Sequence, residues 1–171
     1  MTLPASASAP SAPTSPDYTV TLTAYNAVPA QTDADPFVTA SGAYSNPEII
    51  AARSQDLAKE LPFGTIIEIK NPPVTDDFCG YKTVASIIGY RVIADTMNAR
   101  YTDYIDVLFS TKSNYTSVDG SVRNASTILG NCDGAVIRVV GHIDLTHTRM
   151  PKTQSELAAI VKDGSAPLAV K

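Results

Sequence analysis

Short segments in which β-forming residues alternate run through most of this chain, and they restrict its fold more than any other feature. Residues 18–25 (YTVTLTAY) and 104–110 (YIDVLFS) show the clearest alternation, which predicts strands that bury one face. Further strands are expected at residues 37–41, 65–70, 83–95 with a break at Gly89, and 134–143. The strands do not alternate regularly with helices, as a parallel α/β fold would require. The pattern therefore predicts a small all-β barrel.

Signals for helices are few and short. Ser54 is a candidate N-cap for a helical turn that contains Asp56, and residues 122–129 can form a short helix before Gly130. Residues 153–156 (TQSE) form a capping box, which predicts a surface helix that ends near Gly164. We expect these helices at the periphery of the barrel.

The chain divides into a lead, one domain and a tail, since 171 residues suffice for a single domain with extensions. Residues 1–16 are nearly all Ala, Ser and Pro without a charged side chain, which predicts a flexible or polyproline-like lead. This lead is either an envelope linker that follows a removed signal or anchor, or a plain boundary of the expressed chain. We expect the folded domain at residues 17–150 and a helix and tail at residues 151–171.

Charge and composition argue against several classes of function. The net charge of -4 and the pI of about 5.0 disfavour nucleic-acid binding, which needs a basic face. No run of 18 apolar residues is present, so no membrane span is expected. The histidines, His142 and His147, would face opposite sides of a continuing strand and could not hold one metal ion together. Carboxylates, hydroxyls and a tyrosine remain, and these groups serve acid–base chemistry on sugars.

An ordered series of short motifs carries a resemblance to a known family. The motifs are Thr23-Ala24-Tyr25, Thr39-Ala40-Ser41-Gly42, Leu61-Pro62-Phe63-Gly64-Thr65, Ala94-Asp95-Thr96 and Tyr104-Ile105-Asp106-Val107. The series resembles the 3D (Asp-Asp-Asp) domain of the MltA-type lytic transglycosylases and the stationary-phase survival proteins. The resemblance extends over residues 18–142, and the variant at residues 95–101 looks like a subset of 3D proteins rather than the MltA enzymes.

The resemblance implies a six-stranded double-psi β-barrel with a groove for a peptidoglycan glycan strand. It also implies a lytic transglycosylase that cleaves the MurNAc–GlcNAc β-1,4 bond and forms a 1,6-anhydro ring, without metal or cofactor. The substrate then lies outside the cytoplasm, so a secreted, periplasmic or envelope-associated location is expected. We expect a monomer whose partner is the glycan strand, with no nucleic acid involved.

The resemblance also assigns roles to individual residues. Asp106 matches the general acid/base, and Asp95 matches the second aspartate beside it. The groove positions of the family match Tyr25, Thr39 and Ser41.

Two further residues are candidate substrate-binding groups. The slot of the family's first aspartate reads Ala52-Arg53-Ser54, so Asp56 takes that role after a local shift or the role is empty. Arg100 stands where the MltA enzymes have a glycine-rich loop, and it could bind a lactyl or peptide carboxylate or form an ion pair at the rim.

Each candidate also has a structural interpretation. Asp106 alternates with Ile105 and Val107, so it could be an ordinary solvent-facing strand residue. Asp95 could cap a turn, and Asp56 could serve only at the start of a helix.

Two other functions compete with the enzyme. The altered first-aspartate motif favours a non-catalytic, expansin-like module that binds wall glycan. An aspartic peptidase built on Asp95-Thr96 is the weakest alternative, because Met97 replaces the expected glycine and no second such motif exists.

The two cysteines, Cys79 and Cys132, are expected to form a disulfide, because we expect the protein to be exported. The alternative is a pair of free, buried thiols in a reduced protein.

Overall fold

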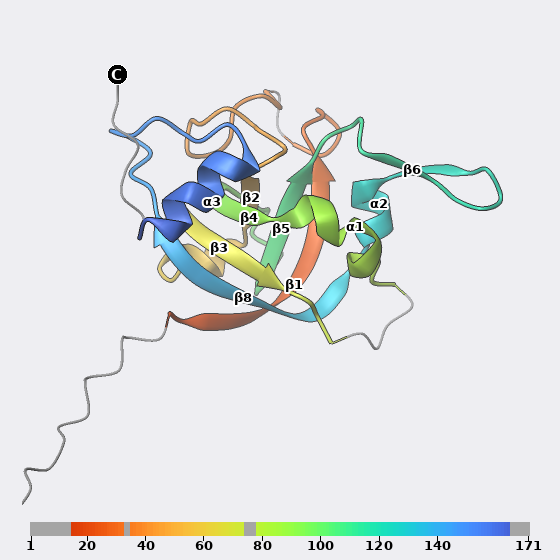
Figure 1. The fold of residues 1–171 in the computed structure, drawn as a ribbon, viewed down its shortest axis with the longest axis horizontal. Coiled ribbons are helices and arrows are strands. Elements are labelled where there is room, and N and C mark those ends of the chain that lie inside the picture. Colours follow the sequence, from red (N-terminus) through yellow and green to blue (C-terminus); the bar gives the residue numbers. More distant parts are fainter. Residues whose placement is uncertain (1–14, 33–34, 74–77, 165–171) are drawn as a thin grey trace, which may run out of the picture.

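Strands of the described residues close into a six-stranded barrel (Figure 1). The computed structural model describes residues 15–32, 35–73 and 78–164. The barrel strands are β1 (Asp17–Asn26), β2 (Ile50–Arg53), β3 (Thr65–Lys70), β4 (Tyr90–Thr96), β5 (Tyr104–Phe109) and β8 (Cys132–His142). Their order around the barrel is β1-β5-β2-β4-β3-β8. The expected all-β barrel is confirmed.

The strand pairing has an internal two-fold pattern. β1 is parallel to β5 and β2 is parallel to β4, whereas the pairs β2–β5, β3–β4, β3–β8 and β1–β8 are antiparallel. Exchanging β1, β2 and β3 with β4, β5 and β8 converts β1–β5 into β2–β4 and β1–β8 into β3–β4, and leaves β2–β5 and β3–β8 as they are, with the same orientations. The axis of this exchange passes through the central β2–β5 pair.

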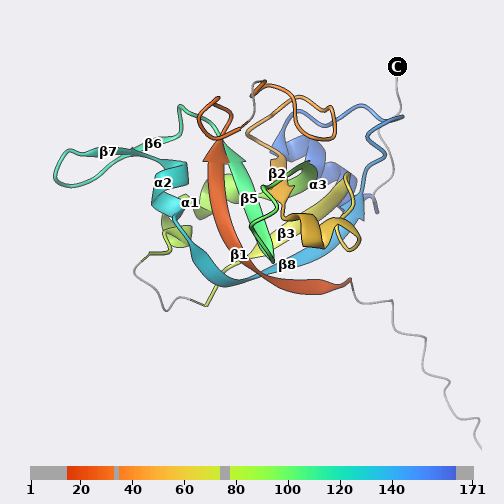
Figure 2. The same ribbon diagram turned by 180° about the vertical axis from the view of Figure 1, so that it is seen from behind.

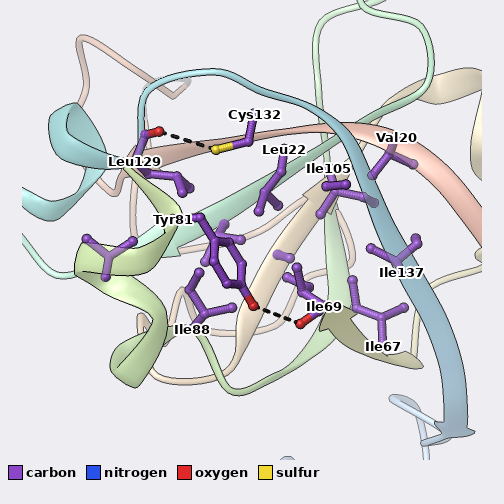
Figure 3. Close-up of a cluster of buried hydrophobic side chains, with 14 of the residues drawn as sticks. Val20, Leu22, Ile67, Ile69, Tyr81, Ile88, Ile105, Leu129, Cys132 and Ile137 are labelled. Carbon is purple, nitrogen blue, oxygen red and sulfur yellow. Dashed lines mark hydrogen bonds between the residues drawn. The ribbon is translucent and has the colours of Figure 1, made fainter. Parts of the chain in front are cut away.

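The barrel interior is a single apolar cluster, which follows from the alternation along the strands. Leu22, Ile105 and Ile137 point inward and are fully buried. Helices α1 (Tyr81–Ile88) and α2 (Ala125–Leu129) cover one end of the barrel and add Tyr81, Ile88 and Leu129 to the cluster (Figure 3).

A second apolar cluster lies outside the barrel, beneath helix α3 (Gln154–Lys162). Leu157 and Ile160 of α3 contribute to it together with Val92 of β4. The Thr153 side chain accepts a hydrogen bond from the Glu156 amide at the start of α3, so the predicted cap is confirmed.

Three local predictions were wrong or incomplete. Residues 83–88, predicted as strand, belong to α1, because Tyr81, Val84 and Ile88 lie on one buried helix face and Gly89 (φ 56°) ends the helix. Residues 37–41 form no strand, and only Val38 makes an isolated bridge there. In place of one helix over residues 122–129, β7 (Val122–Asn124) pairs with β6 (Asn114–Thr116), and α2 follows.

Ser54 begins only a short 3-10 helix (Gln55–Ala58), and its side chain does not cap it. Instead the Ser54 hydroxyl accepts a hydrogen bond from the Tyr104 amide at 3.0 Å. The hydroxyl therefore joins the end of β2 to the start of β5.

The predicted lead lies outside the described residues except for residues 15–16, and so does the tail from residue 165. Across the described ranges, no helix is both long and apolar enough to cross a bilayer.

Arg91 on β4 is fully buried and connects several elements through backbone carbonyls. Its guanidinium donates to the carbonyl oxygens of Pro47, Ile50, Ile87, Ile88 and Leu108 at 2.6–3.3 Å. Burial lowers its pKa to about 9, so the side chain is still charged at neutral pH.

We expect Arg91→Met to lower the free energy of unfolding by about 2–4 kcal/mol, because it leaves buried carbonyls without a donor. Arg138→Met is the control, since Arg138 makes an exposed ion pair with Asp17 and should change stability by less than about 1 kcal/mol. Urea unfolding of both variants measures the difference. Equal losses would show that the buried hydrogen bonds of Arg91 add nothing.

A disulfide joins Cys79, just before α1, to Cys132 at the start of β8. It closes a loop with a sequence separation of 53 residues. We expect the denatured, unreduced protein to show no free thiol, and reduction to cost about 4 kcal/mol of stability. Thiol titration followed by urea unfolding with and without reductant tests both statements. Two titratable thiols before reduction would contradict the bond.

Candidate active site

Four residues form a row across neighbouring strands of the barrel. Thr23 of β1 pairs with Asp106 of β5, Asp106 pairs with Ala52 of β2, and Ala52 pairs with Asp95 of β4. Strands are about 4.8 Å apart, so one small alanine separates the two carboxyl-bearing strands. In Figure 2, β1, β5 and β2 run side by side on the face toward the viewer.

A register shift places Asp95 in this row. Ala51 pairs with Ile93, but the next residue, Ala52, pairs with Asp95, so Ala94 is the extra residue. Without this irregularity Asp95 would lie opposite Arg53, and its side chain would face the other way.

A groove of about 860 Å³ opens above the row. The row residues and Tyr25 line it from the strands, and several loops add further lining residues. Val38 and Ala40 belong to one loop, and Met97, Arg100 and Tyr101 belong to another.

Asp106 lines the groove, and its carboxyl group keeps its proton to an unusually high pH. Ile105 and Val107 on either side of it point into the core, as the alternation predicts. Thr23 Oγ1 donates a hydrogen bond to Asp106 Oδ1 at 2.8 Å. Burial raises the pKa of Asp106 to about 6; the Thr23 hydrogen bond opposes this rise, and the charge of Asp95 adds to it.

Asp95 accepts hydrogen bonds from three groups of the surrounding structure. Its Oδ1 accepts from the amides of Ala40 and Thr96, and its Oδ2 accepts from the Tyr25 hydroxyl, all at 2.9 Å. Burial and the charge of Asp95 raise the pKa of Tyr25 well above its usual value. Tyr25 is therefore a hydrogen-bond donor, and Asp95 also holds the loop that contains Ala40 against the end of β4.

Thr39 and Ser41 lie beside the groove but do not line it. Their hydroxyls are 3.0 Å apart, but the two residues lie in a turn and not on the strand predicted for residues 37–41. Thr39 is buried, and its hydroxyl donates to the Ala43 carbonyl. The two side chains therefore stabilise the turn that presents Ala40 to Asp95.

Asp56 is also outside the groove lining. Its Oδ2 accepts a hydrogen bond from the Asp103 amide at 3.0 Å, and hydrogen bonds with Ser54 and Asp103 hold its pKa below the usual value despite some desolvation. Asp103 has a positive φ of 58°, so this bond stabilises an uncommon backbone conformation.

Thr23 and Ala52 belong to the site, although the sequence alone assigned no role to either. Thr23 lies two positions from Tyr25 on a predicted strand, so their shared face was a usable signal. Ala52 belongs to the segment that was compared with the family's first aspartate, so the sequence pointed to its position, whereas the shift at Ala94 leaves no such signal because it arises from strand pairing. Within the described residues, no group of three or more His, Cys, Asp or Glu side chains could hold a metal ion.

Comparisons with known proteins do not add to this picture. A scan against protein-family models found no match, and a search of curated proteins found none either.

The titration of Asp106 provides a direct test of the site. We expect Asp95→Asn to lower the pKa of Asp106, because the neighbouring negative charge is removed, and Thr23→Val to raise it, because a hydrogen bond to the carboxylate is lost. Thr21→Val is the control, since the Thr21 hydroxyl donates to the exposed Asp133. Carboxyl ¹³C chemical shifts followed against pH give the values. Shifts of the same sign in both variants would contradict the arrangement.

The raised pKa of Asp106 also sets the direction of a stability change. Because the folded state holds the proton more tightly than the unfolded chain, stability should fall as the pH rises from about 4 through about 6. Asp106→Asn should remove this fall in urea unfolding measured across that pH range.

Proposed function

We propose that this protein is a peptidoglycan lytic transglycosylase built on a double-psi barrel of the 3D-domain type. The protonatable Asp106 in the floor of a groove is the observation that carries the proposal. The internal two-fold strand pattern, with its two parallel pairs, supports the double-psi topology. Secretion or an envelope location follows from the substrate and agrees with the disulfide.

In the proposed reaction, Asp106 acts first as an acid. Its carboxyl proton moves to the glycosidic oxygen between MurNAc and GlcNAc, the C1–O bond breaks, and the GlcNAc residue leaves with a free hydroxyl. A pKa of about 6 keeps about a tenth of Asp106 protonated at pH 7, where an ordinary aspartate is almost fully ionised.

Asp106 then acts as a base. The ionised carboxylate takes the proton from the C6 hydroxyl of MurNAc while that oxygen bonds to C1 and closes the 1,6-anhydro ring. Asp106 regains its proton, and no water is consumed. The charge of Asp95 raises the pKa of Asp106 and favours the positive charge that develops at C1.

A glycan-binding module without catalysis is the second candidate. The position of Asp56 favours it, because the residue closest to the family's first aspartate supports a loop instead of lining the groove. The same groove and hydroxyl groups would then bind a glycan strand without cleaving it.

Mass spectrometry of purified sacculi incubated with the protein distinguishes the two functions. We expect products that end in 1,6-anhydroMurNAc, one water lighter than the products of a hydrolase. Asp106→Asn should lower product formation by at least about 100-fold while sacculus binding persists, because shape is kept and the transferable proton is lost. Asp95→Asn should slow cleavage and move the falling limb of the pH–rate profile to lower pH.

Asp163→Asn is the matched control, since Asp163 lies exposed at the end of α3. Wild-type cleavage by Asp106→Asn would show that another group is the acid. Binding without any product, in the wild type and in all variants, would replace the enzyme with the binding module.

A further inference from the structure

The loop of residues 97–104, called here the Arg100 loop, carries a compact group of aromatic and cationic side chains at the groove. The ring centroids of Tyr101 and Tyr104 are 5.1 Å apart, and the Arg100 guanidinium lies 4.8 Å from the centroid of the Tyr101 ring. All three residues line the groove that contains Asp95 and Asp106. They are therefore available to the same ligand as the acid pair.

The backbone of the Arg100 loop is fixed at both ends. The Met97 amide donates to the Arg53 carbonyl, and Asn98 accepts hydrogen bonds from the amides of Arg100 and Tyr101. At the other end, Asp56 accepts from the Asp103 amide and Ser54 accepts from the Tyr104 amide. A loop held in this way presents its side chains with little ordering cost on binding.

The groove lining carries side chains of both charges. Among the described residues that line the groove, Arg100 supplies the positive charge, and Asp95 and Asp106 supply the negative charge. Arg100 Nη2 donates to the Tyr101 hydroxyl at 2.9 Å, and its other described contact is with the Tyr101 ring, so Nε and Nη1 can serve a ligand. An anionic group on a bound saccharide is repelled by the acids and attracted to Arg100.

We propose that the Arg100 loop is a specificity subsite for carboxylate-bearing sugars. Tyr101 and Tyr104 contact the apolar face of a pyranose ring, and Arg100 binds the carboxylate that the sugar carries. The inference rests on the proposed glycan function and adds the feature by which the groove distinguishes an acidic sugar from a neutral one.

The test compares glycans that differ in charge, in an Asp106→Asn background that blocks turnover. Calorimetry measures binding of peptide-free GlcNAc–MurNAc strands, of strands with intact stem peptides, and of uncharged GlcNAc oligomers of equal length. We expect a preference for the acidic strands that Arg100→Gln reduces about fivefold, with unchanged affinity for the neutral oligomer. Arg100→Lys should keep part of the preference, because the charge stays and the forked geometry is lost.

Arg123→Gln, in the exposed β7 strand, is the matched control and should leave every affinity unchanged. Tyr101→Leu should weaken acidic and neutral glycans together. If peptide-free strands bind more tightly than the neutral oligomers, the lactyl carboxylate is the group that Arg100 binds. If only the intact strands bind more tightly than the neutral oligomers, that group is a stem-peptide carboxylate.

Two results for Arg100→Gln would overturn the subsite. The preference for acidic glycans could survive the substitution, or the affinities for neutral and acidic glycans could fall equally. The absence of binding to any glycan would overturn it together with the proposed function. An Arg100-dependent preference in a protein that forms no anhydro product would retain the subsite and reject the lytic reaction. Formation of anhydro product without such a preference would retain the lytic reaction and reject the subsite.

Discussion

The parallel pairing of β1 with β5 and of β2 with β4 is the constraint on which the rest of the site depends. These two pairs flank the central β2–β5 pair and bring Thr23, Asp106 and Asp95 into one row, although Thr23 and Asp106 are 83 residues apart in the chain. No local segment could create this row. The row exists only when β1, β5, β2 and β4 have paired, so the site depends on contacts between distant parts of the chain.

Burial of two ionisable groups, Asp106 and Arg91, lowers the stability of the fold, and other interactions must compensate for this loss. Asp106 is placed where burial disfavours its charge, and Arg91 is a buried cation whose hydrogen bonds go to backbone carbonyls. The apolar clusters on both sides of the sheet and the disulfide supply the stability that tolerates these groups. A carboxyl group whose proton is held by its surroundings is suited to acid chemistry, and the same surroundings destabilise the fold when it ionises.

Much of the barrel could be predicted from sequence, because alternation records which face of each strand is buried. The alternation around Asp106 correctly predicted that its side chain points away from the core. Helix α1 was missed because its apolar, β-branched residues also satisfy a strand pattern over so short a length. The shift at Ala94 and the contact between Tyr25 and Asp95 were beyond sequence reasoning, since each arises from strands that meet only in three dimensions.

The two-fold strand pattern has a consequence for how the chemistry is divided between the two halves of the barrel. The exchange that relates the halves converts Thr23 into Asp95 and Asp106 into Ala52, because each member of the row pairs with its neighbour. The related pairs differ in backbone, because only β2–β4 has the shift at Ala94, and in side chains, because β5 carries the acid Asp106 where β2 carries the small Ala52. Rotating the site into the other half of the barrel would therefore require both exchanges, Asp106 with Ala52 and Asp95 with Thr23, and an extra residue in the β1–β5 pair to match the one at Ala94.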